Sequence, residues 1–450
     1  MVQQRSPVID PSSRSPLHPK TGGVGRRQVV LGTLALGAAG ALGGCGRSPD
    51  PVLRLGAMTG TVPAHLPGAF QGFVRSLAEA AAEGIGAEAV DVQVQSLGSS
   101  RAIADLFLQW KTVMAEGPRS GLPSWVPFLG VKEFAPADLM LLGDRWLSMA
   151  RREQWIQTLE MDPSGMAAIT DARWRAVMSE TGQPGGDVWG MPYRWGTTVL
   201  VYRKDKVEEM GGPITDWSDL WRSQLRRKVV LLDQAREVIG ATLKSLGGSY
   251  NTPDLEAVEG LGDRLAALHR QALLYGNTNY LQPLLLGDAW VAMGWSRDIL
   301  PILPRRSQLA AVVPRSGSAL WADLWVRPAA TRDKLAARWP AQGTAAEDSE
   351  SAMAEQKANR QVAEQLRQAW VEFCWTPDIA RRVTLQTTGA APQFLSGDWG
   401  ELVKDNQGSS SDRIRFPEAK TLDQCEFLLP LRESTRQQYH DLWTQLGALG

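Results

Sequence analysis

Tryptophan is the residue type in this chain best suited to chemistry with a small molecule. The sequence has 18 tryptophans, against 9 phenylalanines and 6 tyrosines. A tryptophan face can cover an alkyl chain, and it attracts an ammonium group by a cation–π interaction of about 0.5–2 kcal/mol. Most of these rings are nevertheless expected to be core side chains. The core tryptophans that we predict are Trp217, Trp221, Trp290, Trp325 and Trp375.

Residues for the common catalytic chemistries are scarce. The histidines, which show no metal-ligand spacing, are His18, His65, His269 and His440. The sequence has no P-loop, no zinc-protease motif and no Gly-x-Ser-x-Gly elbow, and no glycine-rich dinucleotide fingerprint follows a strand of the mature chain. We therefore predict that the protein is not an enzyme and that it uses no metal and no other cofactor.

Size and charge narrow the class of protein further. The chain has 450 residues, of which 43% are hydrophobic and 21% are charged, and this is enough for two lobes with separate cores. Lysine and arginine total 48, and so do aspartate and glutamate. Because no positive surplus is left to neutralise a phosphate backbone, we predict no nucleic-acid partner.

The first 45 residues resemble an export signal. Residues 1–25 are rich in proline and serine and show no apolar period, and Arg26 and Arg27 then precede an apolar stretch at residues 29–42. That stretch is shorter than the roughly 20 residues of a membrane-spanning helix. The arginine pair resembles a twin-arginine signal, which exports a folded chain. We predict that residues 1–44 are a cleaved signal peptide.

Residues 42–45, Leu-Gly-Gly-Cys, resemble the lipobox of bacterial lipoproteins. In that pattern Cys45 carries diacylglycerol and becomes the first residue of the mature chain. We therefore predict a periplasmic protein held at the membrane surface by a lipid on Cys45. A membrane anchor that is not cleaved and an ordinary leader cut nearby are the alternatives.

The rest of the chain alternates strands with helices. The apolar run at residues 228–232 has strand length, and an amphipathic segment follows it at once, at residues 233–246. Further strands are predicted at residues 51–56, 89–94, 138–142, 289–295, 309–313 and 321–326. Such alternation indicates an α/β fold in which helices cover both faces of a parallel sheet.

Three other segments carry specific predictions. A helix is expected to begin with Thr252 as its N-cap and to bury Leu261 and Leu268 on one face. Residues 332–367 are charged with little apolar period, so we predict a solvated insertion there. Cys374 and Cys425 each lie among apolar residues, where a buried thiol is expected, and a disulfide between them is left open.

Seven segments, in chain order, resemble the solute-binding proteins of ABC importers, and most of all their spermidine/putrescine-binding branch. Residues 190–202 read Gly-Met-Pro-Tyr-Arg-Trp-Gly-Thr-Thr-Val-Leu-Val-Tyr, similar to the crossover signature of that branch. The other segments are residues 215–221, 231–238, 251–254, 287–295, 320–324 and 376–380. The resemblance implies a type II periplasmic-binding-protein fold, with two α/β lobes, crossing strands between them and a ligand cleft that closes on its solute.

The crossover positions divide the chain into the domains that we predict. They are an export signal at residues 1–44, lobe 1 at residues 45–194 plus 322–392, lobe 2 at residues 195–321 plus 393–450, and the charged insertion at residues 332–367.

The resemblance also implies a set of ligand-binding residues. In this branch a glutamate at the position of Glu237 holds an amine, rings at the positions of Trp295 and Trp321 wall the slot for the methylene chain, and Asp323 takes an amine. Glu237 lies one turn into the helix that follows residues 228–232, so it can point into a cleft. The alternative is an acidic side chain that merely favours a helix N-terminus. Trp195, in the crossover segment, is a further candidate.

Other positions depart from the branch. Gln234 replaces a carboxylate, which loses about 1 kcal/mol or more towards a cationic ligand. Asp144 can supply the lost carboxylate, but its neighbour Arg145 can equally neutralise it or bind an anion. Two further family motifs are replaced, at residues 58–62 and 389–392. Affinity for a polyamine is therefore expected to be reduced.

Together these observations predict a lipid-anchored solute-binding protein that acts as a monomer. It would bind a polyamine such as putrescine or spermidine and deliver it to the membrane permease of an ABC transporter. The same fold binding a zwitterion or an anion recruited by Arg145 is the first alternative. A non-transport lipoprotein with a vestigial cleft is the second, and an enzyme exported with its cofactor is the third.

Overall fold

The computed structural model describes residues 52–80, 90–116, 136–161, 169, 171–179, 186–331, 334, 350–402 and 410–448. The predicted signal peptide at residues 1–44, its Cys45 and most of residues 332–349 lie outside these ranges. Within the described ranges no helix has both the length and the apolar character needed to cross a bilayer.

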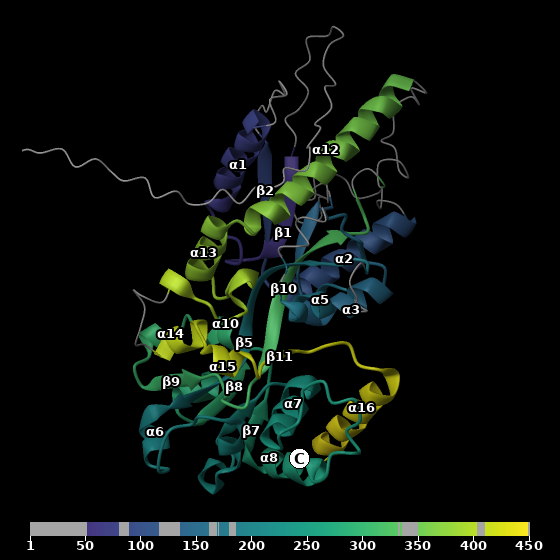
Figure 1. The fold of residues 1–450 in the computed structure, drawn as a ribbon. Coiled ribbons are helices and arrows are strands. Elements are labelled where there is room, and N and C mark those ends of the chain that lie inside the picture. The colour runs from purple at the N-terminus through teal and green to yellow at the C-terminus, as the bar shows by residue number, and fades with distance from the viewer. Residues whose placement is uncertain are drawn as a thin grey trace, which may run out of the picture. The chain divides into compact units, whose positions relative to one another are not determined.

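A mixed sheet organises the described residues (Figure 1). Its main path runs in the order β2-β1-β3-β10-β5-β8-β6-β7, and β4, β9 and β11 pair at its side. The strands are β1 (Val52–Met58), β2 (Asp91–Leu97), β3 (Leu139–Gly143), β4 (Ile156–Gln157), β5 (Met191–Arg203), β6 (Val229–Leu231), β7 (Ala272–Tyr275), β8 (Val291–Trp295), β9 (Leu309–Val312), β10 (Ala319–Pro328) and β11 (Glu426–Phe427).

The two long strands β5 and β10 join the two parts of this sheet. They pair with each other in antiparallel fashion, from Thr197 opposite Leu320 to Met191 opposite Trp325. Beyond that stretch β5 pairs with β8 and β9, whereas β10 pairs with β3 along its other edge, from Asp323 to Val326; all of these pairings are antiparallel. The pairs β1–β2, β1–β3, β6–β7 and β6–β8 are parallel, as predicted. The parallel sheet predicted from the sequence is therefore present only in part: the sheet is mixed, because β5 and β10 pair with each other and with β3, β8 and β9 in antiparallel fashion.

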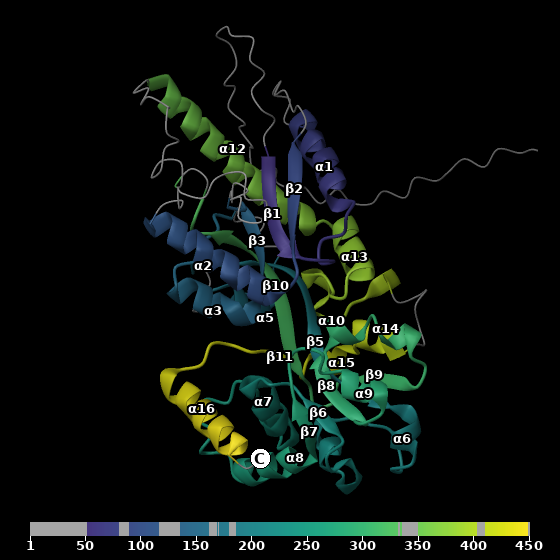
Figure 2. The same ribbon diagram turned by 180° about the vertical axis from the view of Figure 1, so that it is seen from behind.

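Helices cover both faces of the sheet, which is why its central strands are largely buried. Figure 2 shows β1 and β2 between α2 and α3 on one side and α1 and α12 on the other. The helices are α1 (Leu66–Ala80), α2 (Ser100–Glu116), α3 (Asp144–Arg152), α5 (Ala172–Met178), α6 (Lys204–Glu208), α7 (Ala235–Ser245), α8 (Leu261–Gln271), α9 (Gln282–Leu286), α10 (Ser296–Ile299), α12 (Glu350–Cys374), α13 (Pro377–Gln386), α14 (Ser410–Arg415), α15 (Ala419–Leu422) and α16 (Glu433–Gly447).

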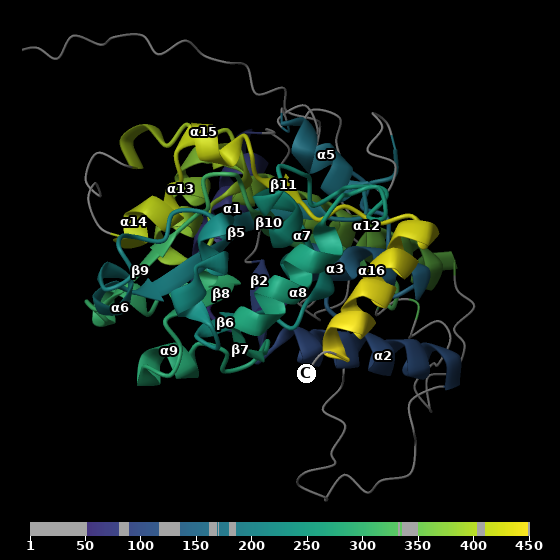
Figure 3. The same ribbon diagram turned by 90° about the horizontal axis from the view of Figure 1, so that it is seen from below.

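The helix predicted to begin at Thr252 begins later. Residues 252–260 form turns, and α8 starts at Leu261 after Gly260, whose φ of 73° is left-handed. A side chain of α16 holds the turn, because Gln438 Oε1 accepts the backbone N–H of Leu255 at 2.9 Å. Figure 3 shows α16 alongside α7 and α8. The buried face of the helix was nevertheless predicted correctly, since Leu261 and Leu268 are buried.

The charged segment and the cysteines can now be placed. The end of the predicted insertion lies in α12, where Leu366 and Arg367 are buried, whereas residues 335–349 are not described, so its limits stay a prediction. Cys374 and Cys425 are both buried and both free, which removes the disulfide left open above. Of the five predicted core tryptophans, Trp217 and Trp325 are fully buried, and the other three are half-buried against the core.

Candidate ligand-binding site

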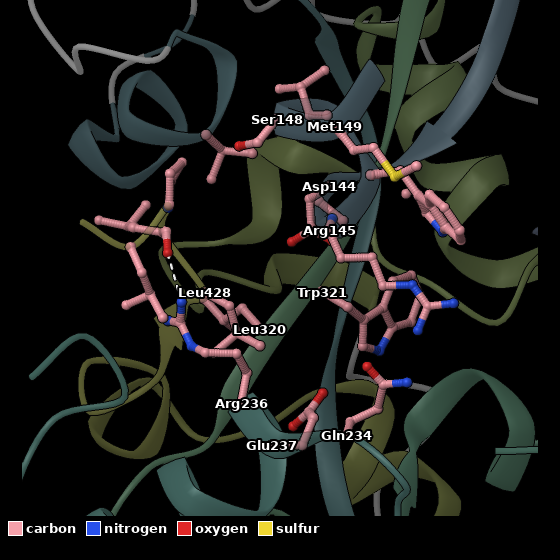
Figure 4. A pocket seen from close by; sticks show the side chains of 18 of the residues that line it. Asp144, Arg145, Ser148, Met149, Gln234, Arg236, Glu237, Leu320, Trp321 and Leu428 are labelled. Carbon is pink, nitrogen blue, oxygen red and sulfur yellow. Dashed lines mark hydrogen bonds between the residues drawn. The ribbon is translucent and has the colours of Figure 1, made fainter. Parts of the chain in front are cut away.

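A cavity of about 670 Å³ lies between the beginnings of α3 and α7, β10, the end of β8 and the C-terminal segment at residues 428–440. The chain enters α3 directly from β3 and reaches α7 just after β6, so both helices begin beyond strand ends. Sheets of this kind place ligand sites there. Figure 4 shows Asp144 and Arg145 on one side of the cavity, Gln234 and Glu237 on the other, and Trp321 between them.

Glu237 presents a buried carboxylate at the cavity. It lies in the first turn of α7 and is 6% exposed. Its Oε1 accepts hydrogen bonds from Thr198 Oγ1 at 3.1 Å and from Trp295 Nε1 at 3.0 Å. Its Oε2 is buried without a hydrogen-bond partner among the described residues. Burial raises the pKa of this carboxyl, and the two hydrogen bonds together with the charges of Arg145 and Arg236 oppose that rise.

The two predicted slot tryptophans line the same cavity, and the guanidinium of one arginine lies over both rings. Trp295 ends β8 and Trp321 lies in β10; both rings line the cavity and are 6% exposed. The guanidinium carbon of Arg297 lies 5.1 Å from the Trp295 ring centroid and 5.5 Å from that of Trp321. Arg297 was not predicted as a site residue. Its position two residues beyond a slot tryptophan, at the end of a strand, is the signal that could have identified it.

Asp323 is buried in an ion pair. Its Oδ2 accepts a hydrogen bond from Arg194 Nε at 2.7 Å, and the two side chains are only 3% and 2% exposed. Asp323 is not among the residues that line the cavity. The guanidinium of Arg194 also lies 5.7 Å from the Trp321 ring centroid. The amine-binding role of Asp323 stays a prediction. In the structure its carboxylate is paired with a cationic side chain of the protein, that of Arg194.

Trp195 is a core residue and does not line the cavity. It is 1% exposed, its Nε1 donates to the carbonyl of Ala391 at 3.0 Å, and its ring stacks on Trp399 with centroids 6.0 Å apart. These contacts account for the ring without a ligand. Its predicted place in a ligand site stays a prediction.

Asp144 and Arg145 open α3 at the cavity. Asp144 Oδ1 accepts the backbone N–H of Arg145 at 2.8 Å. Burial raises the pKa of Asp144 to about 7; the charge of Asp323 adds to this, while backbone hydrogen bonds and the charge of Arg145 oppose it. The Arg145 guanidinium carbon lies 5.6 Å from the ring centroids of both Trp146 and Trp295. Arg145 therefore reaches the same indole as Arg297.

Gln234 completes the predicted set. It is the N-cap residue of α7, its side chain makes no capping hydrogen bond, and it lines the cavity half-buried. Of the seven predicted ligand-binding residues, the cavity thus unites five, which are Asp144, Gln234, Glu237, Trp295 and Trp321.

Arginine outnumbers carboxylate in the cavity wall. The lining arginines are Arg145, Arg152, Arg236, Arg297 and Arg436, whereas the lining carboxylates are Asp144 and Glu237. Arg236 is committed to the fold, since it donates to the carbonyl of Leu429 at 2.8 Å. Arg436 forms an ion pair with Glu433. The C-terminal segment that supplies part of this wall was not predicted, because short apolar stretches of this kind carry no ligand motif.

A second hollow of about 630 Å³ adjoins the first one. It is lined by the loops after β1 and β2 and by Arg194, and it shares Arg145, Trp295 and Arg297 with the first. These three side chains therefore face both hollows. The described residues contain no group of three or more His, Cys, Asp or Glu that could hold a metal ion.

Comparison with known proteins identifies relatives over the middle of the chain. Residues 135–339 match the family model of bacterial extracellular solute-binding proteins. The spermidine/putrescine-binding periplasmic protein of Escherichia coli is 26% identical over 197 residues, which are 44% of this chain and 55% of that protein. The putrescine/cadaverine-binding protein of Pseudomonas aeruginosa is 26% identical over 175 residues, 37% of this chain and 49% of that protein. The chain thus spans about half the length of these curated relatives.

Solved structures resemble the chain over more of its length. The spermidine/putrescine ABC transporter substrate-binding protein PotD of Streptococcus pneumoniae has a TM-score of 0.62 at 18% identity, covering 89% of this chain and 99% of that one. The TpPotD lipoprotein of Treponema pallidum has a TM-score of 0.55 at 15% identity, covering 88% and 99%. These likenesses confirm the predicted fold class, and the family match confirms the predicted resemblance. The lobe boundaries and the roles of the site residues stay predictions.

Proposed function

We propose that this chain is the solute-binding component of an ABC importer. The proposal starts from the match of residues 135–339 to the family model of bacterial extracellular solute-binding proteins. In this proposal the chain is exported by its signal at residues 1–44 and anchored by a lipid on Cys45. It binds a small solute in the periplasm, carries out no catalysis and passes the solute to a membrane permease.

One observation carries the proposal. Glu237, Trp295 and Trp321 come from α7, β8 and β10, far apart along the chain, and they gather around one cavity of about 670 Å³. A cavity of this size, with an apolar wall and a few converging polar groups, suits a small molecule. The buried Glu237 Oε2, which has no partner among the described residues, is a polar atom available to such a ligand.

Ligand binding would be coupled to closure of the two predicted lobes. Asp144 and Arg145 belong to the lobe predicted at residues 45–194 plus 322–392, and Gln234 and Glu237 belong to the other. A solute that contacts both sets binds more tightly when the sets are close together, so it favours the closed state. The strands β5 and β10, which run between the two parts of the sheet, would act as the hinge.

A polyamine is the ligand to test first. Relatives that match this chain are described as spermidine/putrescine-binding and putrescine/cadaverine-binding proteins. Glu237 and the two tryptophans are the parts of the site that suit an ammonium group on an alkyl chain. A solute with a negative group is the second candidate, and Arg145 and Arg297 favour it because both face the cavity.

Isothermal titration of the purified chain with putrescine, spermidine and a set of amino acids tests the proposal. We expect one class of solute to bind with a stoichiometry of one and to change the tryptophan fluorescence, because Trp295 and Trp321 line the cavity. If no amine produces heat, the polyamine part is wrong. If no solute of any class binds, the vestigial-cleft alternative replaces the importer component.

A further inference from the structure

Arg297 and Arg145 occupy the place that a diamine would need. Arg297 lies over both slot tryptophans, and Arg145 lies 5.6 Å from the Trp295 ring centroid. The methylene chain of a diamine would have to displace this guanidinium in order to cover both rings. Its ammonium groups would then face two positive charges in a partly dry cavity, where repulsion is stronger than in water.

A diamine would also lack a second carboxylate. Asp323 is paired with Arg194 at 2.7 Å, and both side chains are almost fully buried. Withdrawing Arg194 would leave a buried charge without a partner, which is strongly unfavourable. Gln234 is neutral, and Asp144, whose pKa is raised to about 7, carries only part of a negative charge near neutral pH. Among the described residues that line this cavity, Glu237 is left as the single strong anchor for an ammonium group.

The two arginines are available to an anion. No described residue forms a hydrogen bond or ion pair with the Arg145 guanidinium. Arg297 forms one long ion pair, with 3.7 Å between its Nε and Asp298 Oδ1, and Asp298 is 39% exposed, so the guanidinium keeps N–H groups for a ligand. A guanidinium binds a carboxylate through two parallel hydrogen bonds. The N-termini of α3 and α7 face the same cavity, and their dipoles add positive potential there.

Glu237 makes a purely anionic ligand unfavourable. Its Oε2 is buried and has no partner among the described residues, and its Oε1 is held by Trp295 Nε1 at 3.0 Å. The ring that binds Glu237 is therefore the ring over which Arg145 and Arg297 lie. A buried carboxylate next to an anion would be repelled unless a positive group lay between them.

From this juxtaposition we infer that the ligand is a small zwitterion, with an ammonium group that binds Glu237 and a carboxylate that binds Arg145 and Arg297. The aliphatic part between the two charges covers the faces of Trp295 and Trp321. The inference rests on the proposed function, because it concerns the same cavity. It replaces the diamine by a solute of the same size in which one ammonium group has become a carboxylate.

A matched set of four-carbon probes tests the inference. Isothermal titration of the whole chain uses putrescine, 4-aminobutanoate, 2-aminobutanoate and succinate, which all have four carbon atoms. They differ in the charges of their polar groups, in the separation of those charges and in the number of methylene groups between them. We expect one of the two zwitterions to bind at least about tenfold more tightly than putrescine and succinate, since a charge-assisted hydrogen bond is lost or a like charge is met in each of those two.

The outcomes separate this inference from the proposed function. Tighter binding of putrescine or of succinate than of either zwitterion overturns the zwitterion and leaves the solute-binding role intact. Absence of binding by all four probes, by spermidine and by a set of amino acids overturns both.

Substitutions assign the two ends of the ligand. Arg297→Gln should weaken the zwitterion by about tenfold and strengthen putrescine, because it removes the positive charge that lies over both rings. Glu237→Gln should weaken the zwitterion and putrescine alike. The matched control is Arg305→Gln, which changes an exposed arginine outside both hollows and should alter neither affinity.

These variants also give results that would reject the assignment. If Arg297→Gln leaves both the zwitterion affinity and the putrescine affinity at their wild-type values, and thermal unfolding is also unchanged, Arg297 is not part of the anion site. An unchanged zwitterion affinity in Glu237→Gln would remove the ammonium contact. Either result contradicts the inference.

Discussion

The resemblance assigns two carboxylates to the ligand, Glu237 at the beginning of α7 and Asp323 in the middle of β10. Both are buried, but their surroundings differ in charge. Glu237 keeps one oxygen without a described partner, and neutral Trp295 and Thr198 bind the other. Asp323 forms an ion pair with the guanidinium of Arg194. Both side chains are at most 6% exposed, so burial alone does not decide whether a carboxylate can bind a ligand. The presence of an internal counter-ion decides it.

The largest effect is expected from breaking the Asp323 pair. Arg194→Leu should lower the free energy of unfolding by about 3–5 kcal/mol, because it leaves Asp323 buried without its partner. Urea denaturation measures the change. The control is Lys206→Leu, which breaks the exposed Lys206–Glu209 pair and should cost less than about 1 kcal/mol. Equal effects of the two substitutions would mean that Asp323 does not depend on Arg194, and the contrast with Glu237 would disappear.

Glu237 should respond in the opposite way. Glu237→Gln keeps an oxygen for Trp295 and Thr198, so the free energy of unfolding should change by less than about 1 kcal/mol. Affinity for the solute identified by calorimetry should fall by about tenfold or more, because the charge that holds the ammonium group is lost. Asp323→Asn is the matched comparison and should reduce stability far more than affinity. A stability loss without an affinity loss in Glu237→Gln would show that Glu237 is only structural.

Asp144 extends the contrast to pH. Its pKa is about 7 in the folded chain but about 3.9 in an unfolded one, so the folded state binds more protons between these values. Stability should therefore fall as the pH rises from 5 to 8, by about 1–2 kcal/mol once solvent screening is allowed for. Arg145 and Asp323 are the charged side chains that most affect this group.

Urea midpoints of wild type and Asp144→Asn at pH 5 and pH 8 measure this effect. The variant should be the more stable of the two at pH 8, and the difference between them should shrink at pH 5. A difference that does not depend on pH would show that Asp144 is ionised throughout.

Trp295→Phe should change solute affinity less than Glu237→Gln does. The substitution keeps an aromatic face but removes the Nε1–H that donates to Glu237 Oε1 at 3.0 Å. Losing one hydrogen bond to a buried carboxylate should cost about 1–2 kcal/mol of stability and should raise the pKa of Glu237 further. Solute affinity should fall by only a few fold. A loss as large as that in Glu237→Gln would mean that the indole itself is the main ligand contact.

Local patterns predicted most of the strands and the faces of the helices. The apolar run at residues 228–232 contains β6, and the amphipathic segment after it contains α7. The start of α8 was misplaced, because the turn before it is held by Gln438 of α16, some 180 residues further along the chain. A helix-cap motif depends on neighbouring residues and contains no information about so distant a contact. The first residue of α8 could therefore not be predicted from the motif alone.

The sequence likewise predicted some of the site residues and missed others. The two slot tryptophans and Glu237 were predicted, and they do line one cavity. Arg194 lies in a segment that resembles the family, but its pairing with Asp323, 129 residues away, was not predicted. Arg297 and the C-terminal wall at residues 428–440 were missed as well. Arg297 follows a strand end but lies outside the family segments, and the C-terminal wall carries no ligand motif.

By itself the amino-acid sequence determined the order of strands and helices and the side chains that stand where strands end, because hydrophobic period and turn residues act over a few neighbours. Which charges cancel one another was decided only by the tertiary structure. Coulomb energy depends on distance in space and on burial, and sequence spacing specifies neither. The electrostatics of the site therefore differ from those expected from the sequence, because of the positions of three arginines in space: Arg145, Arg194 and Arg297.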